Sequence, residues 1–99
     1  MGKVEILVVG CNPEILAVIL RLINANESWN ATGAAGYAET IDYLQSGTYS
    51  LLLLGAGLAE GEETGLRDFA SANFPDLKIV DHFGGGSGLL FAEIYQALT

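Results

Sequence analysis

The segment Val4–Pro13, which reads VEILVVGCNP, decides the fold of this 99-residue chain. Its first six residues are mostly aliphatic and are followed by Gly10, which is typical of a strand buried on both faces. Asn12 can then cap a helix, and Pro13 suits the first helical position because the N–H that it lacks has no partner there. The segment therefore predicts a buried strand that leads directly into a helix.

The rest of the chain repeats this alternation. We expect further strands over residues 29–35, 49–54 and 77–81, and helices over residues 13–25, 37–45, 60–73 and 89–98. Strands that alternate with helices predict right-handed crossovers and a parallel sheet with helices on both faces. No repeat or linker divides the chain, so residues 1–99 are interpreted as one α/β domain.

The composition is apolar and acidic. Hydrophobic residues make up 51% of the chain, which excludes intrinsic disorder. Twelve acidic and four basic residues give a formal charge of −8. Binding to nucleic acid or to an anionic membrane surface requires Lys and Arg, so the charge argues against both. One cysteine cannot form an internal disulfide, and no signal peptide is visible, so we expect a cytoplasmic location.

Three segments, in order and spacing, resemble the receiver (CheY-like) domain of response regulators. Residues Ile6–Leu16 resemble its first strand and the following loop, Tyr49–Gly55 its third strand, and Phe74–Val80 the approach to its fourth strand. The resemblance implies a three-layer, flavodoxin-like open parallel sheet of about four strands in the order 2-1-3-4. It also implies that the fifth strand of the family is missing, so that the domain is truncated.

The same resemblance implies that the family's functional residues are absent. The family carries an acidic pair where this chain has Gly10 and Cys11, and a phospho-accepting aspartate where it has Gly55. The family's switch Ser/Thr position falls at about Phe83, and its lysine at the end of the fifth strand has no counterpart. Phosphoryl transfer to aspartate needs a carboxylate nucleophile, and Mg²⁺ needs oxygen ligands. We therefore expect a degenerate receiver that is no enzyme, holds no metal or cofactor and is not phosphorylated on aspartate.

Two other hypotheses concern the carboxyl ends of the strands, where ligands bind in open α/β sheets. The glycine-rich loop Gly84–Gly88 precedes a predicted helix, so the backbone of Gly85, Gly86 and Ser87 could hold an anion or small ligand. The plainer interpretation is a flexible bridge. Cys11 and His82 could form a nucleophilic site. The plainer interpretation there is a small buried thiol, with Asp81 and His82 solvated at a strand end.

The first and last predicted helices are apolar nearly all round, which indicates burial on more than one side. In the first, Ile15, Ile19, Leu22 and Ile23 form one stripe, and Leu16, Val18 and Leu20 lie off it. The resemblance implies that both helices lie on the same sheet face. Their outer surfaces then form one apolar patch, and the fourth strand is left as a bare edge. We expect a homodimer or a signalling-protein partner, with these candidate interface residues: Leu16, Leu20, Phe91 and Tyr95.

Overall fold

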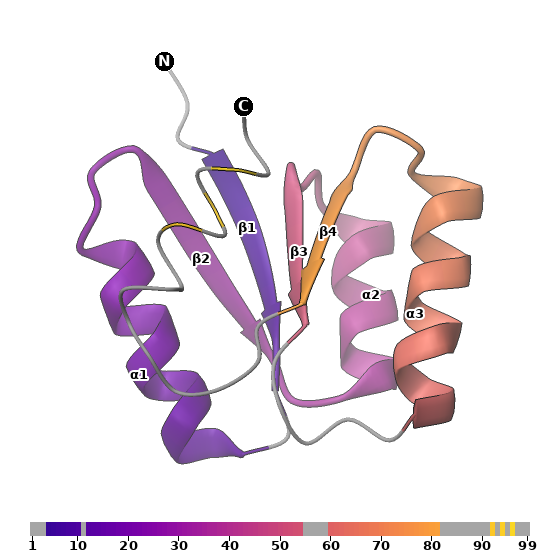
Figure 1. Ribbon diagram of the computed structural model, residues 1–99, viewed down its shortest axis with the longest axis horizontal. Coiled ribbons are helices and arrows are strands. Elements are labelled where there is room, and N and C mark those ends of the chain that lie inside the picture. The colour runs from indigo at the N-terminus through magenta and orange to yellow at the C-terminus, as the bar shows by residue number, and fades with distance from the viewer. Residues whose placement is uncertain are drawn as a thin grey trace.

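The structure is a computed structural model that describes residues 4–10, 12–54 and 60–81 together with Ala92, Ile94 and Gln96. Strands and helices alternate along the chain (Figure 1). The elements are β1 (Val4–Val9), α1 (Pro13–Asn24), β2 (Trp29–Ala34), α2 (Tyr37–Ser46), β3 (Leu51–Leu54), α3 (Glu60–Asn73) and β4 (Lys78–Asp81). The predicted α/β alternation is confirmed.

The strands form one parallel sheet in the order β2-β1-β3-β4, as predicted. Val9 pairs with Ala34 on one side and with Leu54 on the other, and Leu54 pairs with Asp81. The last residues of all four strands are therefore in register, so the sheet has a single carboxyl edge.

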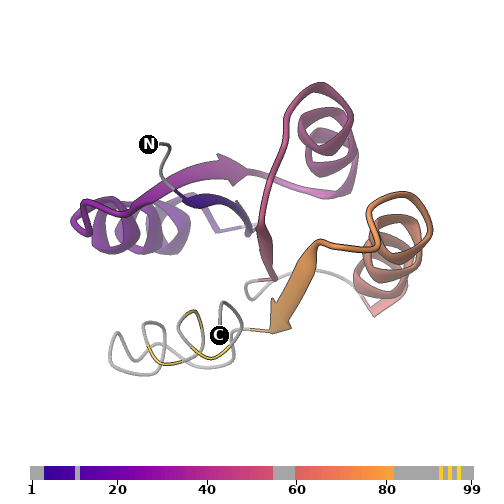
Figure 2. The same cartoon turned by 90° about the horizontal axis from the view of Figure 1, so that it is seen from above.

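The helices cover the sheet in two layers, with α1 on one face and α2 and α3 on the other (Figure 2). One core cluster joins α1 to the sheet through Ile19 and Ile23, and it includes Ile94. The second cluster joins the opposite face to α2 through Leu44 and to α3 through Leu66. Ala92, Ile94 and Gln96 are helical, so these described positions agree with the predicted last helix.

The two central strands are buried on both faces. Ile6, Leu7, Val8 and Val9 are fully inaccessible, and so are Leu51, Leu52 and Leu53. Residues that alternate along β1 enter different core clusters, with Ile6 and Val8 in one and Leu7 and Val9 in the other. This double burial explains why the sequence of these strands is a continuous apolar run instead of an alternating one.

The outer edge of β2 is covered by a side chain of α1. Asn24 accepts a hydrogen bond at Oδ1 from the Ala31 N–H (2.8 Å) and donates one from Nδ2 to the Ala31 carbonyl (3.4 Å). Asn30 of β2 donates to the Glu5 carboxylate on β1 at 2.9 Å. The side chain of Asn24 thus takes the place of a further strand at Ala31 and satisfies both backbone groups of this residue.

The orientation of α1 differs from the prediction. The periodicity predicts Ile15 on the buried stripe, but Ile15 is 48% exposed, and Val18 is 44% exposed. Leu16 and Leu20, predicted off that stripe, are half-buried and pack against the core cluster beneath α1. Their partner is Gly33 of β2, whose missing side chain leaves room for both leucines. The close approach of α1 to Gly33 sets this rotation.

The expected strand over residues 49–54 begins later, at Leu51. Tyr49 is half-buried and packs against the second cluster from the preceding loop. Ser50 nevertheless already bonds to both neighbouring strands, because its N–H donates to Glu5 and its carbonyl accepts from Lys78. For the other elements up to β4, the ends differ from the predicted ones by one residue or not at all, and the ends of the predicted last helix lie outside the described residues.

Substitution of Gly33 by valine is expected to destabilise the fold. An added Cβ would lie 2.7 Å from Leu20 Cδ1 and 3.3 Å from Leu16 Cδ2, so α1 or both leucines must move. Overpacking of this kind costs about 1–3 kcal/mol in free energy of unfolding, measurable by urea denaturation. The control is a double-mutant cycle that combines Gly33→Val with Leu20→Ala. The double variant should lose less unfolding free energy than the sum of the losses of the two single variants. Strict additivity of the two losses would contradict the assigned contact.

Two glycines of α3 form a matched pair for alanine substitution. A Cβ at Gly61 meets nothing within 4 Å, whereas one at Gly65 lies 3.0 Å from Tyr37 Cε2 on α2. Gly61→Ala should therefore raise the free energy of unfolding by about 0.5 kcal/mol, because alanine has the better helix propensity. Gly65→Ala should gain less or lose stability, and Tyr37→Ala should remove this difference. Equal gains at both glycines in thermal unfolding would refute the packing of Tyr37 on α3.

Candidate functional site

The carboxyl edge of the sheet is the first place to look for a site, because ligands of open parallel sheets bind there. The strands reach this edge at Val9, Ala34, Leu54 and Asp81. The first three are buried apolar residues. Asp81 is the one carboxylic residue among these four. Of the residues that follow the strands, the structure describes Gly10, Asn12 and Pro13 after β1, and Ala35 and Gly36 after β2.

Gly10 directly follows the last residue of β1 and lies beside the apolar side chain of Leu16. Its N–H donates to the Ala34 carbonyl at 3.1 Å, which extends the pairing of β1 and β2 by one residue. A Cβ at Gly10 would lie 3.6 Å from Cδ1 and 3.7 Å from Cβ of Leu16. The space beside this residue is thus bordered by a leucine, and a carboxylate placed there would face an aliphatic side chain.

Asn12 is engaged in capping α1, as predicted. Its Oδ1 accepts hydrogen bonds from the N–H groups of Glu14 (3.0 Å) and Ile15 (3.2 Å), and Pro13 follows in the first turn. These bonds satisfy two backbone donors that a helix start leaves without partners. The side chain of Asn12 therefore anchors α1 at the carboxyl edge and has its carbonyl oxygen occupied.

The residues at the positions where the receiver resemblance places its carboxylates do not fit a Mg²⁺ ion. Mg²⁺ requires oxygen ligands in near-octahedral geometry, usually including one or two carboxylates. Gly10 has no side chain, and Cys11 and Gly55 bring no carboxylate by sequence. Within the described ranges, no group of three or more His, Cys, Asp or Glu residues is arranged to hold a metal ion.

Several predicted positions lie outside the described residues. These are the degenerate positions Cys11, Gly55 and Phe83, the anion-binding candidates Gly85, Gly86 and Ser87, the possible catalytic partner His82, and the interface candidates Phe91 and Tyr95. The hypotheses that depend on them stay predictions. Leu16 and Leu20, the other two interface candidates, direct part of their surface toward Gly33, and the large apolar side chains that α1 exposes are Ile15 and Val18.

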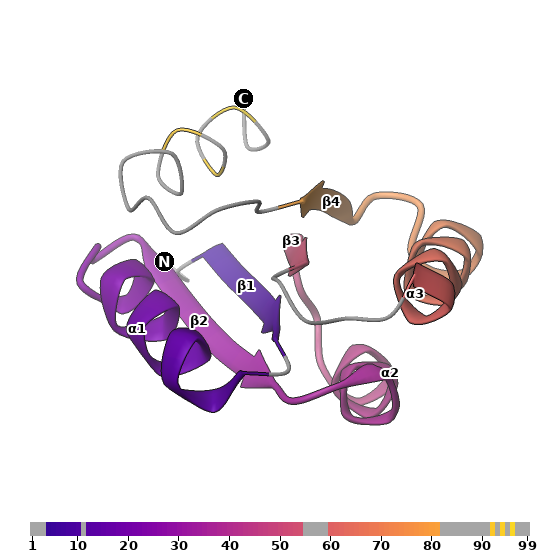
Figure 3. The same cartoon turned by 60° about the horizontal axis from the view of Figure 1, so that its bottom comes forward.

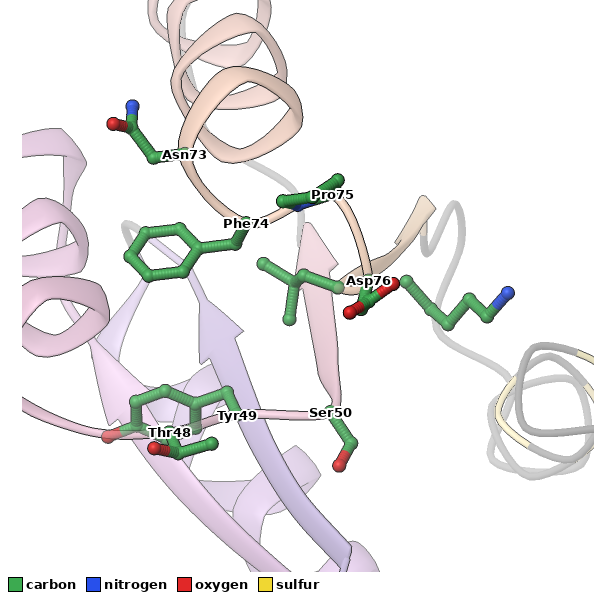
Figure 4. Close-up of a pocket in the computed structure, with 9 residues that line it drawn as sticks. Thr48, Tyr49, Ser50, Asn73, Phe74, Pro75 and Asp76 are labelled. Carbon is green, nitrogen blue, oxygen red and sulfur yellow. The ribbon is translucent and has the colours of Figure 1, made fainter.

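A hollow of about 480 Å³ lies at the opposite end of the sheet, before the starts of β3 and β4 (Figure 4). Its walls come from the loop before β3, with Thr48, Tyr49 and Ser50, and from the turn after α3 that contains Phe74. The Phe74 ring also packs on Phe69 in a tilted arrangement, with the ring centroids 6.0 Å apart. Charged lining is limited to Asp76 and Lys78. No sequence pattern indicates this hollow, because the loops that form it are far apart in sequence.

Strand β4 forms an outer edge of the sheet in the described part of the chain. Among the described residues β4 pairs with β3 alone. Ile79 and Val80 are half-buried, unlike the fully buried leucines of β3, and Lys78 is exposed. Figure 3 shows β4 at one end of the sheet and β2 with α1 at the other. The prediction that the fourth strand forms an outer edge holds within this part of the chain.

Solved structures with this architecture belong to bacterial and archaeal signalling proteins. The signal receiver domain of an HD domain-containing protein from Pseudomonas fluorescens Pf-5 matches with a TM-score of 0.84 and 16% identity, over 97% of this chain and 94% of that chain. A CheY-like receiver domain protein from Methanospirillum hungatei JF-1 matches with a TM-score of 0.71 and 21% identity, over 97% and 76% of the two chains. The response regulator TrrA from Thermotoga maritima, solved with Mg(2+)-BeF, matches with a TM-score of 0.69 and 22% identity, over 78% and 66%.

The chain has the receiver-domain fold. This agrees with the predicted flavodoxin-like architecture and strand order. The match to the Pseudomonas receiver domain covers nearly the whole of both chains, so the two folds have a similar extent. No family model matches the sequence, and no curated protein matches it. In the described part of this receiver fold, no helix is long and apolar enough to cross a membrane.

Loss of the Asn12 cap should weaken the receiver fold at its carboxyl edge. Asn12→Ala removes both bonds from Oδ1 to the first turn of α1, which costs about 0.5–2 kcal/mol of unfolding free energy. Asn12→Asp keeps an acceptor at the same place and should remain near wild type. Chemical denaturation of the three proteins measures the difference. An alanine variant as stable as wild type would contradict the structural role given to Asn12.

Proposed function

We propose that this chain is a non-enzymatic protein-interaction module of two-component signalling type, a pseudo-receiver that is not phosphorylated on aspartate. The observation that carries the proposal is Gly10. It stands at the end of β1, where the receiver resemblance places a carboxylate, and its neighbour in space is Leu16. The cell compartment that fits this function is the cytoplasm.

The residue types at the carboxyl edge support the absence of phosphoryl chemistry. An acyl phosphate forms only when a carboxylate oxygen attacks phosphorus, and the metal that assists this step needs oxygen ligands. Gly10, Cys11 and Gly55 supply none of these oxygens. With no nucleophile and no metal ligands at these positions, the remaining function of the fold is recognition through its surface.

Surface composition supports recognition of another protein. Ile15 and Val18 expose 48% and 44% of their surface on one helix. A formal charge of −8 disfavours nucleic acid and anionic lipid as partners. The solved neighbours include response regulators and a sensor protein, so proteins of this fold occur among signalling components. A homodimer or a docked signalling protein is the partner that we propose.

Incubation with acetyl phosphate and Mg²⁺ tests the absence of phosphorylation. Intact-protein mass spectrometry should detect no mass gain of a phosphoryl group, because the acceptor positions carry no carboxylate. The Thermotoga maritima response regulator, treated in parallel, is the control for active reagent. A phosphorylated fraction that survives neutral pH and is removed by hydroxylamine, which cleaves acyl phosphates, would overturn the proposal.

A further inference from the structure

We propose that the outer face of α1 is a self-association surface on which a second copy of this chain packs in the antiparallel direction. The inference rests on the proposed interaction function and names its partner. It is carried by the arrangement of three exposed side chains: Glu14, Val18 and Arg21. They follow one another at intervals of four and three residues, so they form one row on the helix surface.

This row lies on the side of α1 that faces away from the sheet. Ile19 and Ile23 are buried against the sheet, and Leu16 and Leu20 border Gly33, so the opposite side of the helix carries the row. Val18, in its centre, is 44% exposed, and Ile15 beside it is 48% exposed. An apolar centre with polar ends is the usual anatomy of a small protein interface.

Charge explains why two acidic molecules would meet at this face. The chain has a formal charge of −8, so most of its surface repels a second copy. Helix α1 contains one acidic residue, Glu14, and one basic residue, Arg21, and is therefore neutral. Of the four basic residues, Arg67 is already paired with Glu63 at 3.2 Å on α3. The α1 face thus combines exposed apolar surface with local neutrality.

The positions of the two charges select the antiparallel direction. Glu14 and Arg21 are seven residues apart, about 10.5 Å along the axis, which is too far for them to pair with each other. An antiparallel arrangement about a two-fold axis near Val18 brings Glu14 of each copy beside Arg21 of the other. A parallel arrangement would place Glu14 opposite Glu14 and Arg21 opposite Arg21. Two symmetric ion pairs would therefore flank an apolar contact of Val18 with its own copy.

The length of α1 limits the affinity. Its 12 residues span about 18 Å. One such helix face buries less than the roughly 800 Å² per partner of a standard stable interface. We expect a dissociation constant between about 10 µM and 1 mM, which suits a transient contact.

Sedimentation velocity over a concentration series up to about 1 mM tests this surface, with the full chain and exposed-site variants. Glu14→Arg and Arg21→Glu should each weaken self-association at least tenfold, because both create like-charge contacts across the two-fold axis. An equimolar mixture of the two variants should recover association, because position 14 of each copy then again meets an opposite charge at position 21 of the other. Circular dichroism confirms that each variant is folded. Val18→Glu should abolish the contact from its centre.

Asp42→Arg is the matched control. Asp42 is exposed on α2, on the other side of the sheet, and its reversal changes the net charge by the same amount as Glu14→Arg. If net charge alone governs association, both variants strengthen it; if the α1 pairing governs it, Glu14→Arg weakens association and Asp42→Arg does not. A wild-type chain that stays monomeric to about 1 mM would overturn the proposal. So would a dimer whose dissociation constant is unchanged by both Glu14→Arg and Arg21→Glu. Neither result would restore a phosphorylation site, so the proposed lack of phosphorylation is tested separately.

Discussion

Complete burial of the two central strands is the constraint on which the rest of the structure depends. Leu51–Leu54 of β3 and Ile6–Val9 of β1 are 0–3% exposed, so each face of the sheet must be covered by helices. A fully buried aliphatic side chain contributes about 1.5–3 kcal/mol relative to an exposed one, so these eight residues supply a large part of the apolar stabilisation. Parallel strands require crossover connections, and the crossover helices cover both faces of the sheet, so the parallel order and the three layers agree with this burial.

This constraint explains why the fold does not depend on particular side chains at the carboxyl edge of the sheet. The forces that hold the sheet are apolar contacts and backbone pairing, and neither uses a carboxylate at the strand ends. Gly10 satisfies its N–H through Ala34 and borders Leu16, and Asn12 is occupied as a helix cap. Backbone pairing and helix capping therefore complete this part of the carboxyl edge without a carboxylate at Gly10.

The sequence was sufficient to predict the elements, their order and the parallel sheet, because long apolar runs and the Asn12–Pro13 helix start are local signals. It was not sufficient for the rotation of α1. Seven of the twelve α1 residues are large and aliphatic, so the periodicity does not select one buried stripe. The choice is made by Gly33, which admits Leu16 and Leu20 and leaves Ile15 exposed. That contact joins residues distant in sequence, as does the bonding of Asn24 to Ala31, and no local pattern reveals either.

At the positions of the predicted phosphorylation site, this chain has no carboxylate. We propose that it acts instead through a binding surface on α1. The row of Glu14, Val18 and Arg21 carries one charge of each sign around an apolar centre, so it can bind a complementary row on a second copy without any catalytic group. The central claim is that the carboxyl edge of the sheet binds neither Mg²⁺ nor a phosphoryl group. The most direct test is a titration of the ¹⁵N-labelled chain with MgCl₂ and beryllofluoride, followed by NMR. The account predicts that the amides of Gly10, Asn12 and Leu54 move no more than in a salt-matched control. Saturable shifts centred on these amides would contradict it.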